Sequence, residues 1–328
     1  MKEVFDRKSK VLLVTTPPRF GKTINLNTVR EYVELQECDD HNFFEGTNIW
    51  EYDSYKSHFR KYIVIYISFD GAPTNFKTAS SCLQSAVERA YLDHKCLVNS
   101  EKLSDSSKLR ITRWLNCEVK EEDDIKNGIF HLKTDLKTHH GVDTKFVILV
   151  DEFDQVVSNS MFCLEENELE EIMKTRDSIL QIIKHDAQDI FFSLLTGVTD
   201  ITSVTGSLLN NDERYSLLAN DHFFTFYGLM ENEFENLLQR NPVNDDFYRQ
   251  MKILYNGYER NGKKLFNTWC VIKALHQNVL EDFFSSHSLI TGIIPLIRDL
   301  NMDNYMKKIV SEIPIACTDL LNCHIVVE

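Results

Sequence analysis

Residues 17–23 read Pro-Pro-Arg-Phe-Gly-Lys-Thr and join the apolar run 11–14 to a segment with a helical pattern. Gly-Lys-Thr at a strand-to-helix turn supplies a glycine that can approach a phosphate, a lysine for its oxygens and a hydroxyl for Mg²⁺. The following helix points the positive end of its dipole at the same anion. The usual pattern, G-x-x-x-x-G-K-[ST], starts with a glycine where this chain has Thr16. A surface turn is the alternative interpretation of such a short motif.

A second apolar run ends in two acids. Residues 146–150, Phe-Val-Ile-Leu-Val, are typical of a strand buried on both faces of a parallel sheet, and Asp151 and Glu152 follow. A carboxylate at the tip of such a strand lies beside the phosphate loop of a neighbouring strand and can hold the Mg²⁺ shell. Glu152 is then expected to orient or deprotonate an attacking water. Either motif alone fits an ordinary buried strand and turn, but the two in this order predict nucleotide binding.

Asp154 is the competing candidate for the catalytic base. Alternation of side chains cannot decide between it and Glu152, because the chain leaves the sheet near residue 151. The residue next to the metal-shell Asp151 stays close to the γ-phosphate, whereas the chain should have turned away three residues on. We therefore expect Glu152 to serve the attacking water and Asp154 to act through packing of its loop.

A third apolar run, residues 190–195, continues into polar residues 196–199, Thr-Gly-Val-Thr. Thr196 is expected to contact the γ-phosphate or the attacking water. A plain turn made by threonine and glycine is the alternative.

Strand-like and helix-like segments alternate along most of the chain, which predicts a three-layer α/β fold with a parallel sheet. The strand at 62–69 is expected to lie between the loop strand and the Asp-Glu strand, a topology that would place Glu152 for catalysis. Residues 98–108 look like a polar surface insertion. The expected strands are 11–15, 62–69, 146–150, 190–195 and 222–227, and the expected helices are 23–36, 78–95, 109–116, 121–138 and 168–186.

The pattern changes to helices near residue 230, which divides the chain into a P-loop domain, 1–229, and a smaller helical, lid-like domain, 230–328, that looks truncated. Turn signals predict a two-stranded hairpin through 258–267. The helices expected here are 231–238, 245–254, 269–279 and 280–310, and 311–328 end like a strand cut short.

Composition excludes several classes of protein. The net charge of −14 argues against a protein that mainly grips nucleic acid. No apolar run approaches the roughly 18 residues of a membrane span. Eight cysteines without a Cys-x-x-Cys pair argue against a zinc site and a disulfide scaffold, and favour the cytoplasm or nucleus. The apolar run after the basic N-terminus is too short for a signal peptide and reads as a strand.

Taken together, these motifs resemble the AAA-ATPase-like family, P-loop proteins often joined to a C-terminal PD-(D/E)XK nuclease-like domain. The resemblance implies an ASCE-type P-loop core that binds ATP with Mg²⁺ and hydrolyses it, with Walker A and Walker B motifs at the loop and the Asp-Glu strand. The segments that carry it are PPRFGKT, FFEGTNIW at 43–50, HFRKYIVIYISFDG at 58–71, FVILVDEFD at 146–154, LLTGVTDI at 194–201, LLNN at 208–211, FYGLMENEFENLL at 226–238 and YNGYERNGKKLFNTW at 255–269.

The expected site follows from these motifs. Lys22 bridges the phosphates, and Thr23 and Asp151 organise Mg²⁺ while Glu152 polarises water. Lys22 and Glu152 are thus the expected catalytic residues. The expected nucleotide contacts are Arg19, Phe20, Gly21, Lys22, Thr23, Ile24 and Thr196, and the expected metal ligands are Thr23 and Asp151.

Three departures from the family pattern bear on hydrolysis more than on binding. The loop lacks one of the family's basic residues, because Pro17-Pro18-Arg19 replaces Arg-Pro-Arg-Arg. Asp200 lies where relatives carry Arg or Lys. The segment that usually precedes the first strand is expected to be absent or cut away.

Two other functions compete with an ATP hydrolase. A nuclease is rejected for this chain, since no Glu-x-Lys follows residue 275 and too little chain remains for that fold. A non-hydrolysing binding or scaffold module with the same fold stays open, as does assembly into a homo-oligomer or with a protein partner. Arg214 and Arg240 are candidates for an arginine finger only by location, and surface ion pairs are the favoured interpretation of both.

Overall fold

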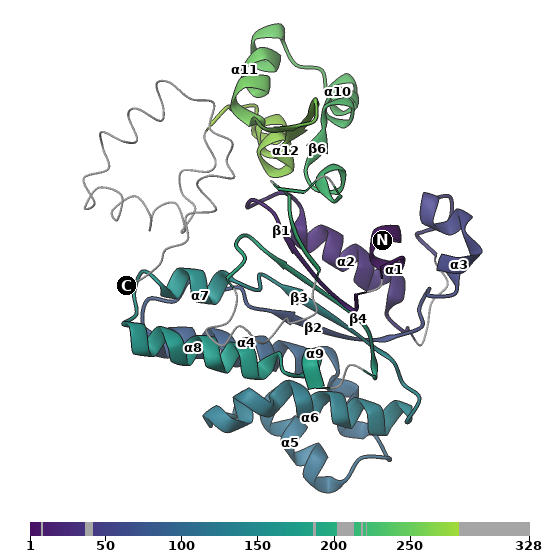
Figure 1. Ribbon diagram of the computed structural model, residues 1–328, viewed down its shortest axis with the longest axis vertical. Coiled ribbons are helices and arrows are strands. Elements are labelled where there is room, and N and C mark those ends of the chain that lie inside the picture. The colour runs from purple at the N-terminus through teal and green to yellow at the C-terminus, as the bar shows by residue number, and fades with distance from the viewer. Residues whose placement is uncertain are drawn as a thin grey trace. The chain divides into compact units, whose positions relative to one another are not determined.

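The computed structural model describes residues 1–7, 9–36, 42–185, 188–201, 213–217, 219–220 and 222–281. A five-stranded sheet forms its centre, in the order β2-β3-β4-β1-β5 (Figure 1). Strands β2 and β3 pair in parallel, as do β3 and β4. The strands are β1 (Val11–Thr15), β2 (Ile63–Ser68), β3 (Phe146–Asp151), β4 (Ile190–Gly197) and β5 (Glu213–Ser216).

The sheet order corrects one expectation. The strand that lies between β1 and β3 is β4, whereas β2 lies at the edge of the sheet. Residues 190–197, not 62–69, are therefore the inserted strand. Since β4 ends in Thr196 and Gly197, the polar tip of the inserted strand lies beside the tip of β3.

The fifth strand is also not the one expected. Residues 222–227 form no strand; Phe224–Phe226 make a short 3₁₀ helix, η3, and the added strand is β5. Phe223, Phe224 and Tyr227 are buried at i, i+1 and i+4, which is the spacing of a helical turn and not of a strand. The strand expected at 222–227 is therefore wrong.

Helices cover both faces of the sheet, which gives the three-layer α/β arrangement predicted from the sequence. Figure 1 shows α2 on one side of the strands and α4, α6 and α8 on the other. Alternate residues of β2 and β3, Ile65 and Ile148 among them, join one large core with α4, α6 and α8. The helices are α1 (Lys2–Phe5), α2 (Lys22–Val33), η1 (Asn48–Glu51), α3 (Asp53–Lys56), α4 (Phe76–Asp93), η2 (Lys95–Asn99), α5 (Asp105–Leu115), α6 (Glu122–His140), α7 (Gln155–Ser160), α8 (Glu166–Ile179) and α9 (Ile182–His185).

The single long helix expected at 168–186 is interrupted. Helix α8 ends at Ile179, Leu180 leaves helical geometry with ψ near 1°, and α9 begins at Ile182. The apolar stripe runs on through the buried Ile183, so periodicity alone cannot locate the break.

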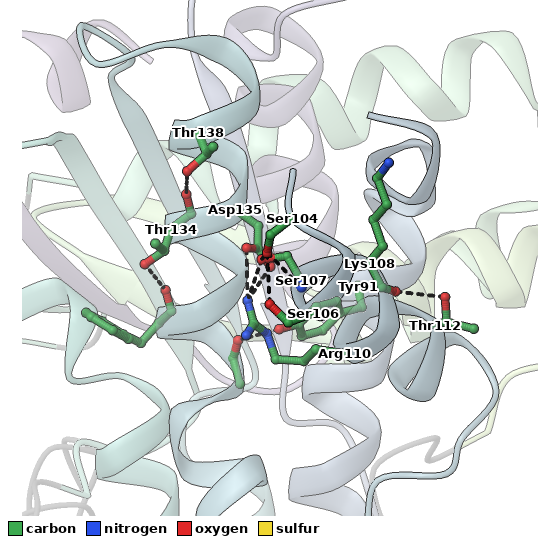
Figure 2. A network of polar contacts seen from close by, with 12 residues as sticks. Tyr91, Ser104, Ser106, Ser107, Lys108, Arg110, Thr112, Thr134, Asp135 and Thr138 are labelled. Carbon is green, nitrogen blue, oxygen red and sulfur yellow. Dashed lines mark hydrogen bonds and ion pairs between the residues drawn. The ribbon is translucent and has the colours of Figure 1, made fainter. Parts of the chain in front are cut away.

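The stretch 98–108 is not a simple surface insertion. Leu97, Ser100 and Leu103 are buried, and they lead into α5. Arg110 of α5 donates to both carboxylate oxygens of the buried Asp135 on α6, at 2.9 and 2.8 Å (Figure 2). This ion pair joins α5 to α6, and removing Arg110 would leave the buried carboxylate of Asp135 without its cation.

The chain folds into two compact units. The first comprises residues 1–14 and 23–214, and the second comprises residues 15–22 with the described residues from Tyr215 to Glu281. The second unit has its own core around Phe234, Met251 and Phe266. The expected hairpin is present as part of a three-stranded sheet in the order β6-β8-β7. The elements of the second unit are η3, β6 (Leu229–Met230), α10 (Glu231–Arg240), α11 (Asp245–Tyr255), β7 (Asn256–Arg260), β8 (Lys263–Phe266) and α12 (Thr268–Gln277).

The expected helix at 280–310, beyond residue 281, and the expected strand at 311–328 lie outside the described residues, as does the LLNN segment at 208–211. Within the described residues, no helix is both long enough and apolar enough to cross a membrane.

Candidate functional site

Asp151 is the centre of a buried polar cluster at the tip of β3. Thr23 Oγ1 donates to Asp151 Oδ2 at 2.6 Å, although the two residues are far apart in the sequence. Thr196 Oγ1 donates to the other carboxylate oxygen, Oδ1, at 2.7 Å. The structure thus brings together the two residues expected to hold Mg²⁺. It directs the hydroxyl of the fully buried Thr196 at Asp151, so Thr196 orients this carboxylate.

Tyr66 is a member of this cluster that sequence reasoning missed. It lies on β2, and its hydroxyl donates to Asp151 Oδ2 at 3.3 Å. Burial, and then the charge of Asp151, raise the pKa of Tyr66 well above its ordinary value, so the phenol stays a donor. The available signal was a single hydroxyl-bearing side chain inside the apolar run Ile-Val-Ile-Tyr-Ile.

Glu152 directly follows the cluster and has an unusual backbone. Its φ is +49°, in the left-handed region, and its carbonyl accepts a hydrogen bond from Gln155 N at 3.0 Å. A residue with a Cβ pays about 1–2 kcal/mol for this conformation. Such strain is concentrated at functional sites, where the surrounding structure enforces it. The turn therefore fixes where Glu152 leaves the sheet.

Asp154 is buried and connects the tips of two strands. Its Oδ1 accepts from the backbone N–H of Val198 at 3.0 Å, and its Oδ2 accepts from the N–H of Thr199 at 2.7 Å. The hydroxyl of Thr199 donates to Oδ2 as well. Both carboxylate oxygens of Asp154 thus accept from the residues that follow β4, which fits a role in packing its loop.

Arg176 supports the same turn from α8, and sequence reasoning missed it too. It is fully buried, its guanidinium lies 4.6 Å from the ring centroid of Phe153, and it donates to Asp177 Oδ1 at 2.8 Å. It also donates to the backbone oxygen of Ile201 at 3.4 Å. A buried cation paired in this way fixes the ring of Phe153, the residue between Glu152 and Asp154 in the turn.

The phosphate loop itself has two left-handed residues, Arg19 with φ +67° and Gly21 with φ +83°. A Cβ built on Gly21 would meet nothing within 4 Å, so the glycine is required by its conformation and not by crowding. Lys22 is buried and is the first residue of α2. The first N–H groups of a helix have no partner within it and are suited to an anion.

Two further residues expected at the nucleotide differ in exposure. Phe20 is 1% exposed, so its side chain anchors the loop, whereas the side chain of Ile24 is 66% exposed. Ile24 therefore has its backbone N–H, in the first turn of α2, to offer a ligand.

The acid at position 200 has a basic partner. Arg214 Nη1 lies 3.2 Å from both carboxylate oxygens of Asp200, and both side chains are partly exposed. Arg214, one of the two candidates for an arginine finger, thus forms the surface ion pair that was its favoured interpretation. Arg240 is the last residue of α10 and is exposed.

The donor set at Asp151 suits magnesium. Carboxylate and hydroxyl oxygens are the ligands of this cation, which commonly takes one or two from the protein and the rest from phosphate and water. Within the part of the chain that the structure describes, no group of three or more His, Cys, Asp or Glu residues could hold a metal. Thr23 with Asp151 fits a site completed by a substrate's phosphates.

Comparison with models of known protein families gives a match to this chain. Residues 1–205 match the family AAA-ATPase_like, described as predicted AAA-ATPase. The matched residues include the phosphate loop, all of β3 and β4, and each member of the cluster around Asp151. No curated protein matches the chain.

Proposed function

The chain belongs to the AAA-ATPase-like family, and from this premise we propose that it binds ATP with Mg²⁺ and hydrolyses it to drive a conformational switch. The observation that carries the proposal is the 2.6 Å hydrogen bond between Thr23 Oγ1 and Asp151 Oδ2. This bond joins the end of the phosphate loop motif to the tip of the acidic strand. A hydroxyl and a carboxylate in contact are the protein's share of an Mg²⁺ shell.

Binding would rest on the loop. Backbone N–H groups from Arg19 to Thr23 cradle the phosphates, and the buried Lys22 reaches the β- and γ-phosphate oxygens. Bound Mg²⁺ supplies neutralisation of charge on those oxygens. Asp151 needs a fixed orientation for this task, and hydroxyl donors from Thr196 and Tyr66 provide it.

Hydrolysis would rest on Glu152. Its left-handed backbone directly after Asp151 keeps it beside the metal-binding carboxylate, where it can orient an attacking water. Asp154 is occupied by the backbone N–H groups of Val198 and Thr199, which leaves Glu152 the better candidate for the base.

A second candidate function is a non-hydrolysing nucleotide-binding module with the same fold. The ion pair between Asp200 and Arg214 favours it. Position 200, where the family pattern has Arg or Lys, carries an acid in this chain, and this acid pairs with Arg214. ATP binding is common to both candidates, and turnover separates them.

Steady release of phosphate from Mg-ATP, measured for the wild type and for Glu152→Gln, tests hydrolysis. Loss of release in the variant with unchanged ATP affinity supports it. Equal, negligible rates in both proteins, with ATP bound, support the non-hydrolysing module. Calorimetry that detects no ATP binding by the wild type would refute both.

A further inference from the structure

Residues 18–20 of the phosphate loop are held by other residues of the same compact unit, the second one. Three consecutive loop residues, Pro18, Arg19 and Phe20, each contact residues from the 228–269 segment. We propose that Asn267 is a positioning residue of this loop, and that through it occupation of the loop by nucleotide is coupled to helix α12. This inference rests on the proposed ATP binding and adds the element that senses it.

Asn267 has a separate partner for each side-chain atom. Its Oδ1 accepts from Cys270 N at 3.0 Å and so caps the N-terminus of α12, while its Nδ2 donates to the backbone oxygen of Pro18 at 3.2 Å. The residue is 2% exposed, and its backbone N–H donates to Tyr255 O at 3.2 Å. A buried amide with fixed partners on both ends ties the position of the loop backbone to the first turn of α12.

Phe20 provides a second attachment. Its backbone oxygen accepts from Gly228 N at 3.1 Å, and its ring packs edge-on against Tyr258 with centroids 5.1 Å apart. Gly228 has φ +82°, and a Cβ there would lie 2.8 Å from Phe20 Cδ1 and 2.9 Å from the backbone oxygen of Phe266. Close approach of this kind leaves the loop little freedom to move without moving β8.

Arg19 provides the third. Its guanidinium lies 4.9 Å from the ring centroid of Trp269, which is the second residue of α12 and is 44% exposed. Arg19 is also a residue with a left-handed backbone, next to the N–H groups that would face the phosphates. A phosphate bound at the loop changes the electrostatic environment of Arg19. The contact between Arg19 and Trp269 therefore transmits nucleotide binding to α12.

The coupling is reciprocal by thermodynamic necessity. If the contacts of Asn267 favour the loop conformation that binds nucleotide, then bound nucleotide favours the contacts of Asn267 by the same factor. A change that loosens α12 from the loop lowers ATP affinity, and ATP in turn protects the amides of α12 from exchange. A residue with a purely structural role would alter exchange in the presence and absence of ATP alike.

The test is Asn267→Ser, because serine caps helices about as well as asparagine but its short, neutral side chain cannot reach Pro18 O. Asn244→Ser is the matched control: Asn244 caps α11 in the same unit by accepting from Phe247 N at 2.8 Å, and no hydrogen bond described for it reaches the loop. Mg-ATP affinity is measured by calorimetry, and hydrogen exchange of residues 268–274 is measured with and without Mg-ATP. Asn267→Asp, a strong cap of the same shape without an amide donor, replaces the serine variant if that variant does not fold.

We expect Asn267→Ser to weaken Mg-ATP binding about two- to tenfold, the worth of one neutral hydrogen bond, and to lose the ATP-induced protection of α12. Asn244→Ser should keep both. If Asn267→Ser binds Mg-ATP as tightly as the wild type and keeps the ATP-induced protection of α12, the coupling is overturned. The proposed function is not affected by that outcome. Equal weakening by both serine variants also overturns it, and absence of binding by the wild type overturns the proposed function and the coupling together.

Discussion

Gly197 and Asp154 lie so close that a Cβ at position 197 would be 2.5 Å from Asp154 Oδ1. Position 197 at the tip of β4 therefore accommodates glycine but not a larger residue, because the carboxylate of Asp154 occupies the space that a Cβ would need. Gly197→Ala should lower the free energy of unfolding by about 1–3 kcal/mol, the usual cost of overpacking. Chemical denaturation checks this value, and stability equal to that of the wild type would mean that the two tips can separate freely.

The two acids after Asp151 should respond differently to loss of charge. Asp154→Asn leaves one amide N–H₂ facing backbone donors of Val198 or Thr199, so we expect destabilisation of about 1–3 kcal/mol with ATP affinity nearly unchanged. Glu152→Gln should keep stability and ATP affinity but trap the bound triphosphate. Turnover lost only in Asp154→Asn would reassign the base to Asp154.

Lys22→Ala should weaken ATP binding about ten- to a hundredfold, because a charge-assisted contact to phosphate is worth roughly 1.5–3 kcal/mol. Calorimetry with Mg-ATP measures the loss. Arg240→Ala, an exposed change at the end of α10, is the control and should bind as the wild type does. Affinity of Lys22→Ala equal to that of the wild type would contradict the phosphate-loop interpretation.

Asp151→Asn should reduce the part of ATP affinity that depends on Mg²⁺. The amide lacks the charge that attracts the cation, and its N–H₂ would oppose a hydroxyl of Thr23 or Thr196. Titrations of both proteins with ATP, in Mg²⁺ and in a chelator, give the difference. An identical response to Mg²⁺ in wild type and variant would show that Asp151 does not hold the cation.

Stability should fall in mild acid because of His94. Burial, the largest cause, lowers the pKa of His94 from 6.5 to about 4, and the ring is hydrogen-bonded to Val64 O at 3.0 Å. The unfolded chain binds a proton below pH 6.5 and the folded chain does not until about pH 4, so stability is present above 6.5 and is lost as the pH falls. From pH 7 to pH 5 the loss from this group is about 2 kcal/mol. His94→Gln should show a shallower dependence in denaturation at the two pH values, and an equal slope would contradict the prediction.

The parts of the fold that sequence could predict are those set by local pattern. Residues 146–150 are apolar at every position, and β3 is buried along its whole length. Gly-Lys-Thr after an apolar strand similarly marks the start of α2 at Lys22. Such features depend on neighbours in the chain, and a single sequence contains them.

The rest depends on contacts between distant residues. Nothing near Tyr66 in the sequence indicates that its hydroxyl meets Asp151, since only the pairing of β2 with β3 brings them together. The place of β4 between β1 and β3 is likewise a choice of topology that periodicity does not encode. Sequence could therefore name Thr23, Asp151 and Thr196, but not Tyr66, nor the fact that Thr196 directs its hydroxyl at Asp151.

The family match ends at residue 205, yet loop residues 18–20 find their partners at Gly228, Tyr258, Asn267 and Trp269. A polypeptide cut at the end of the match would keep every sequence motif for nucleotide binding while exposing the ring of Phe20 and freeing the oxygen of Pro18. The matched stretch of this chain is for this reason shorter than the smallest piece that should hold its own loop in place.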